Sequence, residues 1–350
     1  MIYFNNDYSE GCHESVLQKL NETNLVQTFG YSEDEYCREA ADRIRELCGD
    51  PELKVHFLVG GTQTNLTVIA AALRPHQGVL AADSGHINVH ETGAIEATGH
   101  RVLALPSVDG KITGAQVIRA VREHRGDASF EHMVQPKMVY ISNPTEWGTL
   151  YTLGELEELA AACREMGLYL FLDGARLGYG LTAAGNDITL KDLARLCDVF
   201  YIGGTKCGAL FGEAVVICNE AIAGDFRYII KQRGGMLAKG RLLGVQFSAL
   251  LKDNVYFDIC AHANRLAEQL RETLTVLRYP LYMPNTTNQV FSILPEAVLT
   301  RLDEKYTYSA MQPVDGDKRV VRFCTSWATR QENVDALCAD LKRFSAEQKN

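Results

Sequence analysis

The chain has 350 residues, of which 46% are apolar and 23% are charged, and its formal net charge is -9. A chain of this length and composition folds as an ordinary globular protein with about two or three domains. Because 44 acidic residues outnumber 35 basic ones, binding to nucleic acid or to an anionic membrane surface is not expected to be its main activity.

The ten cysteines include no Cys-x-x-Cys pair and lie mostly within apolar stretches such as 162–164 and 216–218. The first residues contain neither a basic segment nor an apolar segment of the kind found in secretory signals. The sequence also lacks a run of about 18 apolar residues. We therefore expect a cytoplasmic protein with reduced thiols, without a disulfide scaffold and without a membrane span.

Short apolar runs alternate with segments of helical periodicity through the first two-thirds of the chain. The expected strands are 55–59, 78–82, 102–105, 137–142, 168–172, 198–202 and 214–218. The expected helices between them are 65–74, 86–98, 114–124 and 153–166. Almost wholly apolar strands separated by amphipathic helices predict an α/β fold with a mostly parallel sheet that is covered on both faces.

The pattern changes after about residue 221, where a smaller α+β unit is expected to follow. Its expected elements are a helical region over 242–277 with a break near Asp253-Asn254, strands 289–294 and 319–324, and a closing helix 331–344. We place the domain boundary inside the helical region. Residues 1–245, including the N-terminal segment, then form the large domain, and residues 246–350 form the small C-terminal domain.

A glycine-rich turn follows the first of the expected parallel strands. Ligands of such sheets bind at the carboxyl ends of the strands, and strand 55–59 runs into Gly60-Gly61-Thr62-Gln63-Thr64-Asn65 and then a helix. Backbone N–H groups and the positive helix end could bind a phosphate there. The turn matches neither the Walker loop nor the dinucleotide fingerprint, and a plain glycine turn with a threonine cap is the alternative.

Two further strand ends carry charged residues. Strand 168–172 ends in Asp173-Gly174-Ala175-Arg176, whose carboxylate and guanidinium suit a cationic ring nitrogen and an anionic substrate group. Strand 198–202 ends in Gly203-Gly204-Thr205-Lys206, where a confined lysine can act as an amine nucleophile. Taken singly, the aspartate could cap a turn and the lysine could be solvated.

Together, the three strand ends match the needs of pyridoxal 5'-phosphate (PLP). The phosphate of this cofactor needs backbone amides, its pyridine nitrogen needs a carboxylate, and its aldehyde needs a lysine. A phosphate turn, then an aspartate, then a lysine is also the order in which fold-type I PLP enzymes present these groups.

At these residues the sequence resembles the threonine aldolase branch of the β-eliminating lyase family. The resemblance covers nearly the whole chain, and its most discriminating element is Asp173-Gly174-Ala175-Arg176 followed by Lys206. The matching segments are Asn6-Asp7, Gly61-Thr62-Gln63-Thr64-Asn65, Asp83-Ser84-Gly85-His86, Glu91-Thr92-Gly93-Ala94, Leu172 to Arg176, Thr205-Lys206 and Val321-Arg322-Phe323. The resemblance implies a fold-type I PLP-dependent transferase-like architecture with PLP as cofactor.

The resemblance also implies residue roles. His86 would stack on the cofactor ring, Asp173 would bind its nitrogen, and Lys206 would form an imine with its aldehyde. The implied phosphate contacts are Gly61, Thr62 and Thr205, and the implied contacts of the substrate carboxylate are Asn6, Arg176 and Arg322, with Arg176 near the cofactor as well. A solvated His86 at a helix start is the alternative. His90 and Glu91 lack a third ligand at a suitable spacing, so no metal site is expected.

The sequence departs from the family pattern in three places. Glu146 stands where the family usually has a catalytic histidine, and it either replaces that histidine as base or indicates a different substrate. Asn6 replaces a serine associated with the substrate carboxylate. Leu237 replaces an arginine that often contacts the phosphate of the neighbouring subunit. The residues that could supply this contact instead are Lys231, Arg233 and Lys239, and the sequence does not choose among them.

The resemblance implies a carbon–carbon lyase that cleaves L-threonine or L-allo-threonine to glycine and acetaldehyde by retro-aldol cleavage of Cα–Cβ, after the amino acid replaces Lys206 on the cofactor. Lys206, His86 and Glu146 are the expected catalytic residues, and the base could be His86, Glu146 or a water. The alternatives are another β-eliminating PLP lyase and a catalytically silent PLP-fold binding protein. A homodimer or homotetramer is expected, in which 29–31 reach the partner's site.

Overall fold

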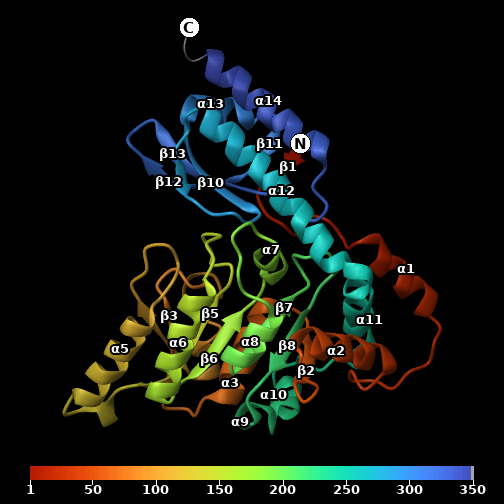
Figure 1. Ribbon diagram of the computed structural model, residues 1–350, viewed down its shortest axis with the longest axis vertical. Coiled ribbons are helices and arrows are strands. Elements are labelled where there is room, and N and C mark those ends of the chain that lie inside the picture. The colour runs from red at the N-terminus through yellow and green to blue at the C-terminus, as the bar shows by residue number, and fades with distance from the viewer. Residues whose placement is uncertain (348–350) are drawn as a thin grey trace.

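A seven-stranded sheet forms the centre of the larger of two lobes (Figure 1), and the structure, a computed structural model, describes residues 1–347. The strand order is β2-β8-β7-β6-β5-β3-β4. The strands are β2 (Lys54–Leu58), β3 (Gln77–Ala82), β4 (Arg101–Leu105), β5 (Gln135–Ser142), β6 (Tyr169–Asp173), β7 (Val199–Gly203) and β8 (Glu213–Ile217). Only β8 runs antiparallel to its neighbours in this sheet. The mostly parallel sheet expected from the sequence is therefore confirmed.

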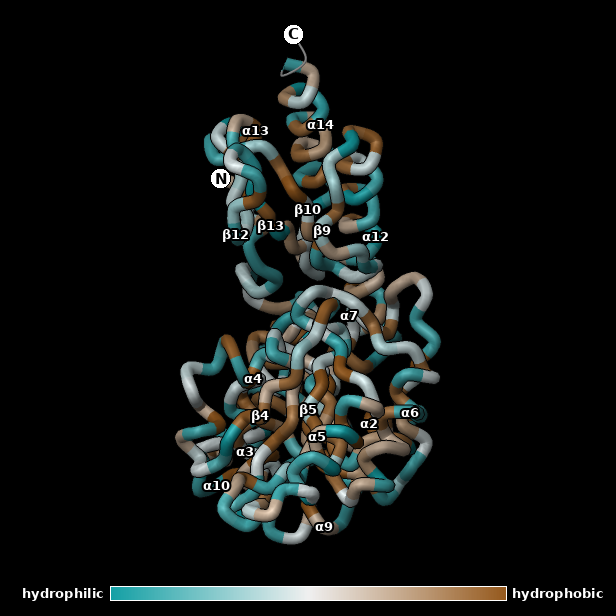
Figure 2. The backbone as a smooth tube through the Cα atoms, turned by 90° about the vertical axis from the view of Figure 1, so that its left-hand side faces the viewer, coloured by the Kyte–Doolittle hydropathy of each residue, from teal (hydrophilic) through white to brown (hydrophobic). Residues whose placement is uncertain are grey.

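Two separate hydrophobic cores lie on the two faces of this sheet, because successive strand residues point to opposite faces. Leu170 and Leu172 of β6 belong to one core, and Phe171 belongs to the other. The first core is covered by α2 (Glu35–Cys48), α5 (Gly114–Gly126), α6 (Leu153–Met166), α8 (Leu190–Leu196) and α11 (Arg241–Leu250). The second is covered by α3 (Gly61–Ala72), α9 (Glu220–Ala223) and α10 (Phe226–Gln232). Figure 2 shows hydrophobic residues concentrated along the central strands and hydrophilic ones outside.

The smaller lobe contains a four-stranded antiparallel sheet of order β12-β13-β10-β9. Its strands are β9 (Leu281–Met283), β10 (Gln289–Pro295), β12 (Ser309–Val314) and β13 (Lys318–Cys324). Its helices are α12 (Val255–Val276), α13 (Glu296–Leu302) and α14 (Gln331–Glu347). Their buried apolar residues form a third core, separate from the two cores of the large sheet.

The N-terminal segment is shared between the lobes. Strand β1 (Ile2–Tyr3) pairs in parallel with β11 (Tyr306–Thr307), and Phe4 is buried in the core of the smaller lobe. The segment then crosses to the larger lobe, where Asp7 contacts Arg176. The domain boundary at 245/246 stays a prediction, and it falls inside α11.

The expected break in the long helical region is confirmed. Asp253 and Asn254, in a 3-10 turn (Lys252–Asn254) between α11 and α12, have positive φ angles of 49° and 65°. The expected helix over 86–98 is wrong: α4 covers only His86–Val89, and a 3-10 turn covers Glu96–Thr98. Thr92 and Gly93 between them have φ angles of 55° and 71°, which an α-helix does not accommodate.

The helix expected over 65–74 begins earlier, because α3 starts at Gly61 directly after the glycine turn. Seven helices were not anticipated from the sequence: α1 (Glu14–Thr23), α2, α7 (Leu177–Leu181), α8, α9, α10 and α13. Within residues 1–347, no helix combines the length and the apolar character that a membrane crossing requires.

Candidate active site

Two cavities of about 290 Å³ and 520 Å³ lie beside the carboxyl ends of the central strands. They share lining residues, so one inner and one outer chamber form a single site. The shared residues are Tyr8, His86, Glu146, Arg176 and Lys206. Gly61, Thr62, Asp173 and Thr205 line the inner chamber, and Arg322 lines the outer one.

Asn6 is the one sequence-predicted site residue that lines neither chamber. Its side-chain oxygen accepts hydrogen bonds from the Tyr8 backbone N–H at 2.9 Å and from the Ser9 hydroxyl at 3.0 Å. Asn6 therefore stabilises the turn that presents Tyr8 to both chambers. Its neighbour Asp7 is fully buried and is the closer link between this segment and the site.

Asp173 is held as an ionised carboxylate at the end of β6. Its Oδ2 accepts hydrogen bonds from the Tyr140 hydroxyl at 2.5 Å and from Asn65 Nδ2 at 3.0 Å, and its Oδ1 accepts one from the Ala175 backbone N–H at 2.9 Å. Burial alone would raise the pKa of Asp173, but the charge of His86 and the hydrogen bonds outweigh it and lower the pKa. The residue can therefore pair with a cationic group at neutral pH.

His86 is oriented by a buried carboxylate. Its Nδ1 lies 2.7 Å from Oε1 of Glu91, whose side chain is fully buried, and the same oxygen accepts a hydrogen bond from Asn65 Nδ2 at 2.7 Å. Burial lowers the pKa of His86, but the Glu91 contact and the charge of Asp173 raise it above its ordinary value. Asn65 thus connects His86 and Asp173 through one network, which leaves Nε2 of His86 for the cavity.

Lys206 follows β7 and lines both chambers. The Tyr179 hydroxyl donates to its backbone oxygen at 2.5 Å, which fixes the main chain behind the side chain. Burial and the charge of Arg176 lower the pKa of Lys206, although Asp7, Asp173 and Glu213 act in the opposite direction. A lowered pKa increases the fraction of neutral amine, which is the nucleophilic form.

The glycine turn leaves the start of α3 free for an anion. Gly60 precedes the helix, and no side chain caps its N-terminus. A Cβ on Gly61 would lie 3.3 Å from the Tyr201 hydroxyl, so a side chain there would narrow the inner chamber. An uncapped helix start beside a hydroxyl residue, Thr205, is suited to a phosphate group.

These residues fit PLP. The inner chamber joins an uncapped helix start, an ionised strand-end carboxylate and a buried lysine with a lowered pKa. Asn65 Oδ1 and Glu91 Oε2 are buried side-chain atoms without a hydrogen-bond partner, so the network beside the chamber still has acceptors to offer. Within residues 1–347, no cluster of histidine, cysteine and carboxylate side chains is suited to a metal ion.

The two predicted arginines differ in their partners. Arg176 forms a bidentate ion pair with the buried Asp7, with Nε and one Nη lying 2.7 Å and 2.9 Å from the two carboxylate oxygens. Arg322 on β13 donates to neutral acceptors, Gln289 Oε1 and Ser309 Oγ, at 3.2 Å and 3.0 Å. Its Nε is buried without a partner. Arg322 is therefore the guanidinium whose charge is available to an anionic ligand of the outer chamber.

Glu146 lies beside His86 on the loop after β5. Its Oε1 accepts hydrogen bonds from the His86 backbone N–H at 2.9 Å and from the Ser142 hydroxyl at 2.7 Å. Burial raises the pKa of Glu146, the hydrogen bonds lower it, and the charge of Asp173 adds to the net increase. A carboxylate whose pKa is raised toward neutrality is a better proton acceptor than an ordinary glutamate.

Sequence reasoning missed the site roles of Glu91 and Glu213. Glu213 begins β8, is buried, and places a second carboxyl group beside Lys206. Burial raises the pKa of Glu213 to about 8, although the hydrogen bond from Thr205 and the charge of Lys206 lower it. Position could have indicated it, because an acid at the start of an otherwise apolar strand is unusual. Glu91 lies in the segment that periodicity wrongly predicted as helix, so the sequence did not indicate where its side chain points.

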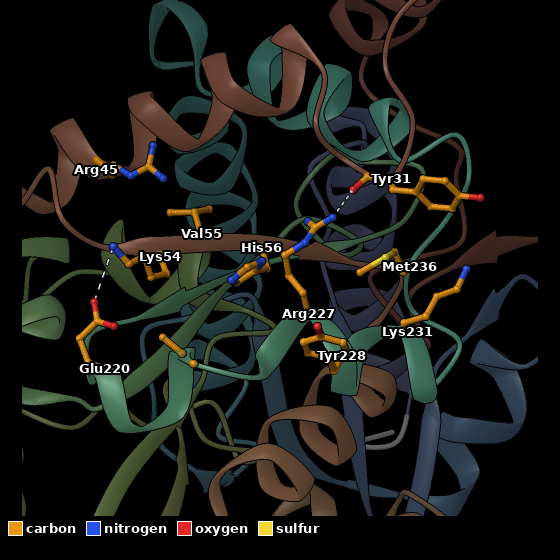
Figure 3. Close-up of a pocket in the computed structure, with 12 residues that line it drawn as sticks. Tyr31, Arg45, Lys54, Val55, His56, Glu220, Arg227, Tyr228, Lys231 and Met236 are labelled. Carbon is orange, nitrogen blue, oxygen red and sulfur yellow. Dashed lines mark hydrogen bonds and ion pairs between the residues drawn. The ribbon is translucent and has the colours of Figure 1, made fainter.

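A cavity of about 810 Å³, larger than either chamber, lies elsewhere, beside the edge strand β2 and helices α9 and α10 (Figure 3). Its charged side chains are engaged with neighbours: Lys54 lies 3.6 Å from Glu220, and Arg227 donates to the Tyr31 backbone oxygen at 3.3 Å. Burial lowers the pKa of His56 to about 4. These residues do not bring an acid, a base and a nucleophile together, so this cavity is not the candidate active site.

Of the three cations proposed for a cross-subunit contact, Lys231 lines that cavity, whereas Arg233 and Lys239 do not. Lys231 lies over the Tyr31 ring, 4.9 Å from its centroid, Arg233 has a buried Nε without a partner, and Lys239 is exposed. Leu237 packs against the first core of the large sheet. A charged side chain at position 237 would therefore lose this apolar packing.

The chain is similar to several known proteins over almost its whole length. A family model described as β-eliminating lyase matches residues 13–297. The chain is 31% identical to the low-specificity L-threonine aldolase of Pseudomonas aeruginosa, over 97% of this chain and 96% of that protein. It is 30% identical, over the same shares of the two chains, to the enzyme of the same name from Pseudomonas sp. (strain NCIMB 10558).

Solved structures extend these similarities. The Leishmania major threonine aldolase superimposes with a TM-score of 0.96 at 47% identity, over 99% of this chain and 100% of that one. A Thermus thermophilus aspartate aminotransferase has a TM-score of 0.71 at 17% identity, over 98% of this chain and 91% of that one, which shows a common fold.

Proposed function

Because the chain belongs to the β-eliminating lyase family, we propose that it is a PLP-dependent carbon–carbon lyase that cleaves L-threonine and L-allo-threonine to glycine and acetaldehyde. The observation that carries the proposal is the meeting of Lys206, Asp173 and Arg322 around one two-chambered site. Relatives and a solved structure that are named for threonine aldolase support the choice of substrate.

Several side chains would hold the cofactor. Lys206 would hold it covalently, Asp173 would pair with its ring nitrogen, and His86 would lie against its ring. Gly61, Thr62 and Thr205 would bind its phosphate. When bound, PLP supplies an electron sink for the pair of electrons that the breaking Cα–Cβ bond leaves on Cα.

The outer chamber would orient the amino acid. Arg322 would bind its carboxylate through a guanidinium that the protein leaves without a carboxylate partner. Arg176 would assist with the N–H groups that Asp7 does not occupy. Binding the carboxylate at a fixed point sets which bond of Cα faces the sink, and this choice separates Cα–Cβ cleavage from loss of the Cα proton.

Cleavage also requires that a base take the proton of the substrate hydroxyl. We assign this task to Glu146, because it lines both chambers and its pKa is raised toward neutrality. His86 has a raised pKa because of Glu91 and Asp173 and therefore carries a proton more readily than it accepts one. His86 would accordingly position the ring and the substrate, with its protonated form donating a hydrogen bond.

The central test joins a covalent readout to a substrate assay. Reduction of the PLP-loaded protein with borohydride should leave the cofactor attached to the peptide that contains Lys206, and Lys206→Ala should show no such adduct by mass spectrometry. L-threonine, L-allo-threonine, phenylserine and a β-substituted alanine should be assayed together. Failure to release an aldehyde from any of the three hydroxy amino acids would exclude the aldolase reaction, and pyruvate from the alanine derivative would indicate a β-elimination instead.

We also propose that the protein assembles as a homodimer or a homotetramer. Leu25 and Phe29 on the loop after α1 are 91% and 79% exposed, and Tyr228 on α10 is 77% exposed. Apolar side chains in such numbers on a surface favour a protein interface. In this assembly 29–31 would reach the site of a second copy. A fully active protein that sediments as a monomer would contradict it.

We further propose that the protein works in the cytoplasm. All ten cysteines are free thiols, and eight of them are buried. Buried thiols without disulfides are typical of proteins from reducing compartments. Labelling of the thiols in intact cells, followed by fractionation, would check the compartment directly.

A further inference from the structure

Glu213 places a carboxyl group in the chamber that is suited to a phosphate. It lines the inner chamber together with Gly60, Gly61, Thr62 and Thr205. A carboxylate near a phosphate dianion repels it, and burial strengthens that repulsion because water screens it less. The residue therefore calls for a physical explanation that the proposed cofactor site does not itself provide.

The position of Glu213 is fixed by its strand and by two hydrogen bonds. It lies opposite Gly203 of β7 and Leu58 of β2 in the sheet register. Its Oε1 accepts from the Thr205 hydroxyl at 2.8 Å, and its Oε2 accepts from the Gly204 backbone N–H at 3.2 Å. Both donors are neutral and both precede Lys206 directly. Glu213 thus holds the backbone and the hydroxyl of the segment that carries the catalytic lysine.

The Thr205 hydroxyl is shared in this arrangement. It donates to Glu213 and at the same time accepts from the Gly212 backbone N–H at 3.0 Å. Its single proton is therefore committed to Glu213 while the glutamate is ionised. A protonated Glu213 accepts one hydrogen bond fewer, and the Thr205 hydroxyl is then free to donate to another anion.

The surroundings of Glu213 favour its protonated form on balance. The ionisable groups that face it are Lys206, Asp173, Tyr201 and Tyr256, of which Lys206 favours the carboxylate and Asp173 opposes it. Apolar side chains lie next to the neighbouring glycines: a Cβ on Gly212 would touch Leu243, and one on Gly204 would touch Phe247. Burial in this setting raises the pKa of Glu213 to about 8, so the group titrates within reach of neutral pH.

We propose that Glu213 is a proton-carrying positioning residue of the phosphate turn: it takes a proton from solvent when the cofactor phosphate binds, and it releases Thr205 to contact that phosphate. This inference rests on the proposed PLP site and adds a residue that the family resemblance does not assign. Without bound phosphate and above about pH 8, the ionised Glu213 accepts the hydrogen bond of the Thr205 hydroxyl. Phosphate binding then requires uptake of one proton.

The linkage has a fixed sign. A phosphate dianion near Glu213 raises the pKa of the glutamate further, so the bound state holds a proton that the free state has lost. The affinity for the phosphate should be independent of Glu213 below about pH 7. It should then fall by up to about tenfold for each pH unit above the pKa of the free state, until the bound state titrates as well.

The test uses a ligand that cannot react with Lys206. We suggest 4-deoxypyridoxine 5'-phosphate, which keeps the ring and the phosphate of PLP but lacks the aldehyde. Its binding to the full-length apoprotein should be measured by calorimetry at pH 6.5 and 8.5, in two buffers of different ionisation enthalpy. Wild-type protein should take up more protons at pH 8.5 than at pH 6.5. Glu213→Gln should reduce this increase to the part that the phosphate of the analogue itself contributes, and it should bind more tightly than wild type at pH 8.5.

Glu220→Gln is the matched control, because Glu220 begins α9 and pairs with Lys54 far from the turn. It should behave like wild type. Equal proton uptake by wild type and Glu213→Gln would overturn the inference and leave the PLP site standing. Failure of wild type to bind the phosphate analogue at either pH would overturn the proposed site and the inference together. If Glu213→Gln does not fold, the absence of any pH dependence in wild type alone would still overturn the inference.

Discussion

Arg176 and Asp7 form an ion pair that is almost out of contact with water, with side-chain exposures of 14% and 0%. Asp7→Asn keeps the shape but leaves the guanidinium buried without a counter-charge. We expect a loss of about 3–5 kcal/mol in the free energy of unfolding at pH 7, measured by urea denaturation. Glu165→Gln, which removes the exposed partner of Arg122, should cost less than about 1 kcal/mol.

The same ion pair predicts how stability changes with pH. Burial raises the pKa of Asp7, but Arg176 and Lys206 outweigh it, so the folded pKa lies below the ordinary value of an aspartate. The stabilisation from Asp7 is therefore fully present above the unfolded pKa and is lost as the pH falls through the folded pKa. The stability difference between wild type and Asp7→Asn should accordingly narrow below about pH 4.

His86 predicts the opposite dependence. Its folded pKa is raised by Glu91 and Asp173, so the stabilisation from the His86–Glu91 contact is present below the unfolded pKa and is lost as the pH rises through the folded pKa. In thermal unfolding of the apoprotein, His86→Gln should be destabilised relative to wild type more at pH 5.5 than at pH 9. His132→Gln, which changes an exposed histidine, is the control and should cost little stability. A larger deficit for His86→Gln at pH 9 would contradict the charge assignment.

The sequence allows site residues to be predicted where they follow the end of a strand, and less well where they begin a strand. Asp173, Thr205 and Lys206 could be placed at one edge because parallel strands bring their carboxyl ends together. Glu213 reaches the same edge only because β8 runs antiparallel, which puts its first residue where its neighbours have their last. That direction depends on tertiary pairing and cannot be read from an apolar run of five residues.

The elements of the site depend on the close approach of β6 and β7 at their carboxyl ends. A Cβ on Gly174 would overlap the backbone oxygen of Tyr201, and one on Gly203 would overlap that of Ala175. Gly174→Ala should therefore push the two strand ends apart, cost about 3 kcal/mol in unfolding free energy, and separate Asp173 from Lys206. PLP absorbance together with urea denaturation would measure both effects.

Gly154→Ala is the contrasting change for that prediction. Gly154 lies in α6, and a Cβ there would meet no atom within 4 Å. Alanine is the better helix former, so the substitution should stabilise the protein by up to about 1 kcal/mol. Similar losses at both glycines would show that close packing of the strand ends is not the cause.

Periodicity gave accurate bounds for an expected helix of the large lobe that has capping residues at both ends, wrong bounds where the backbone turned sharply, and no prediction for the capped helices α2 and α8. Helix α6 has the bounds expected from the sequence, since Thr152 and Glu155 form a capping box and Gly167 ends the helix. The segment 86–98 also has apolar residues at helical spacing, but positive φ angles at Thr92 and Gly93 break it. That turn brings Glu91 to His86, so the failed helix prediction and the missed site residue have one cause.

For the whole molecule, the exposed apolar loop should control assembly. Phe29→Ser removes a large apolar side chain that is 79% exposed on this loop, and we expect it to weaken association of the subunits at least tenfold by sedimentation equilibrium. Val108→Ser changes a side chain that is 93% exposed on the opposite end of the strand layer, in the loop after β4, and should leave association unchanged. Equal effects at both positions would indicate nonspecific loss of apolar surface.

The pairing of β1 with β11 has a consequence for biosynthesis. Ile2 leaves the ribosome about 300 residues before its partner Tyr306. Until Tyr306 is available, the segment that carries Asp7 cannot pair with the smaller lobe, and the ion pair between Arg176 and Asp7 is not held in place. The nascent chain can therefore assemble most of the large sheet early, yet its catalytic centre matures only after β11 has been translated, so no product that ends before β11 carries a finished site.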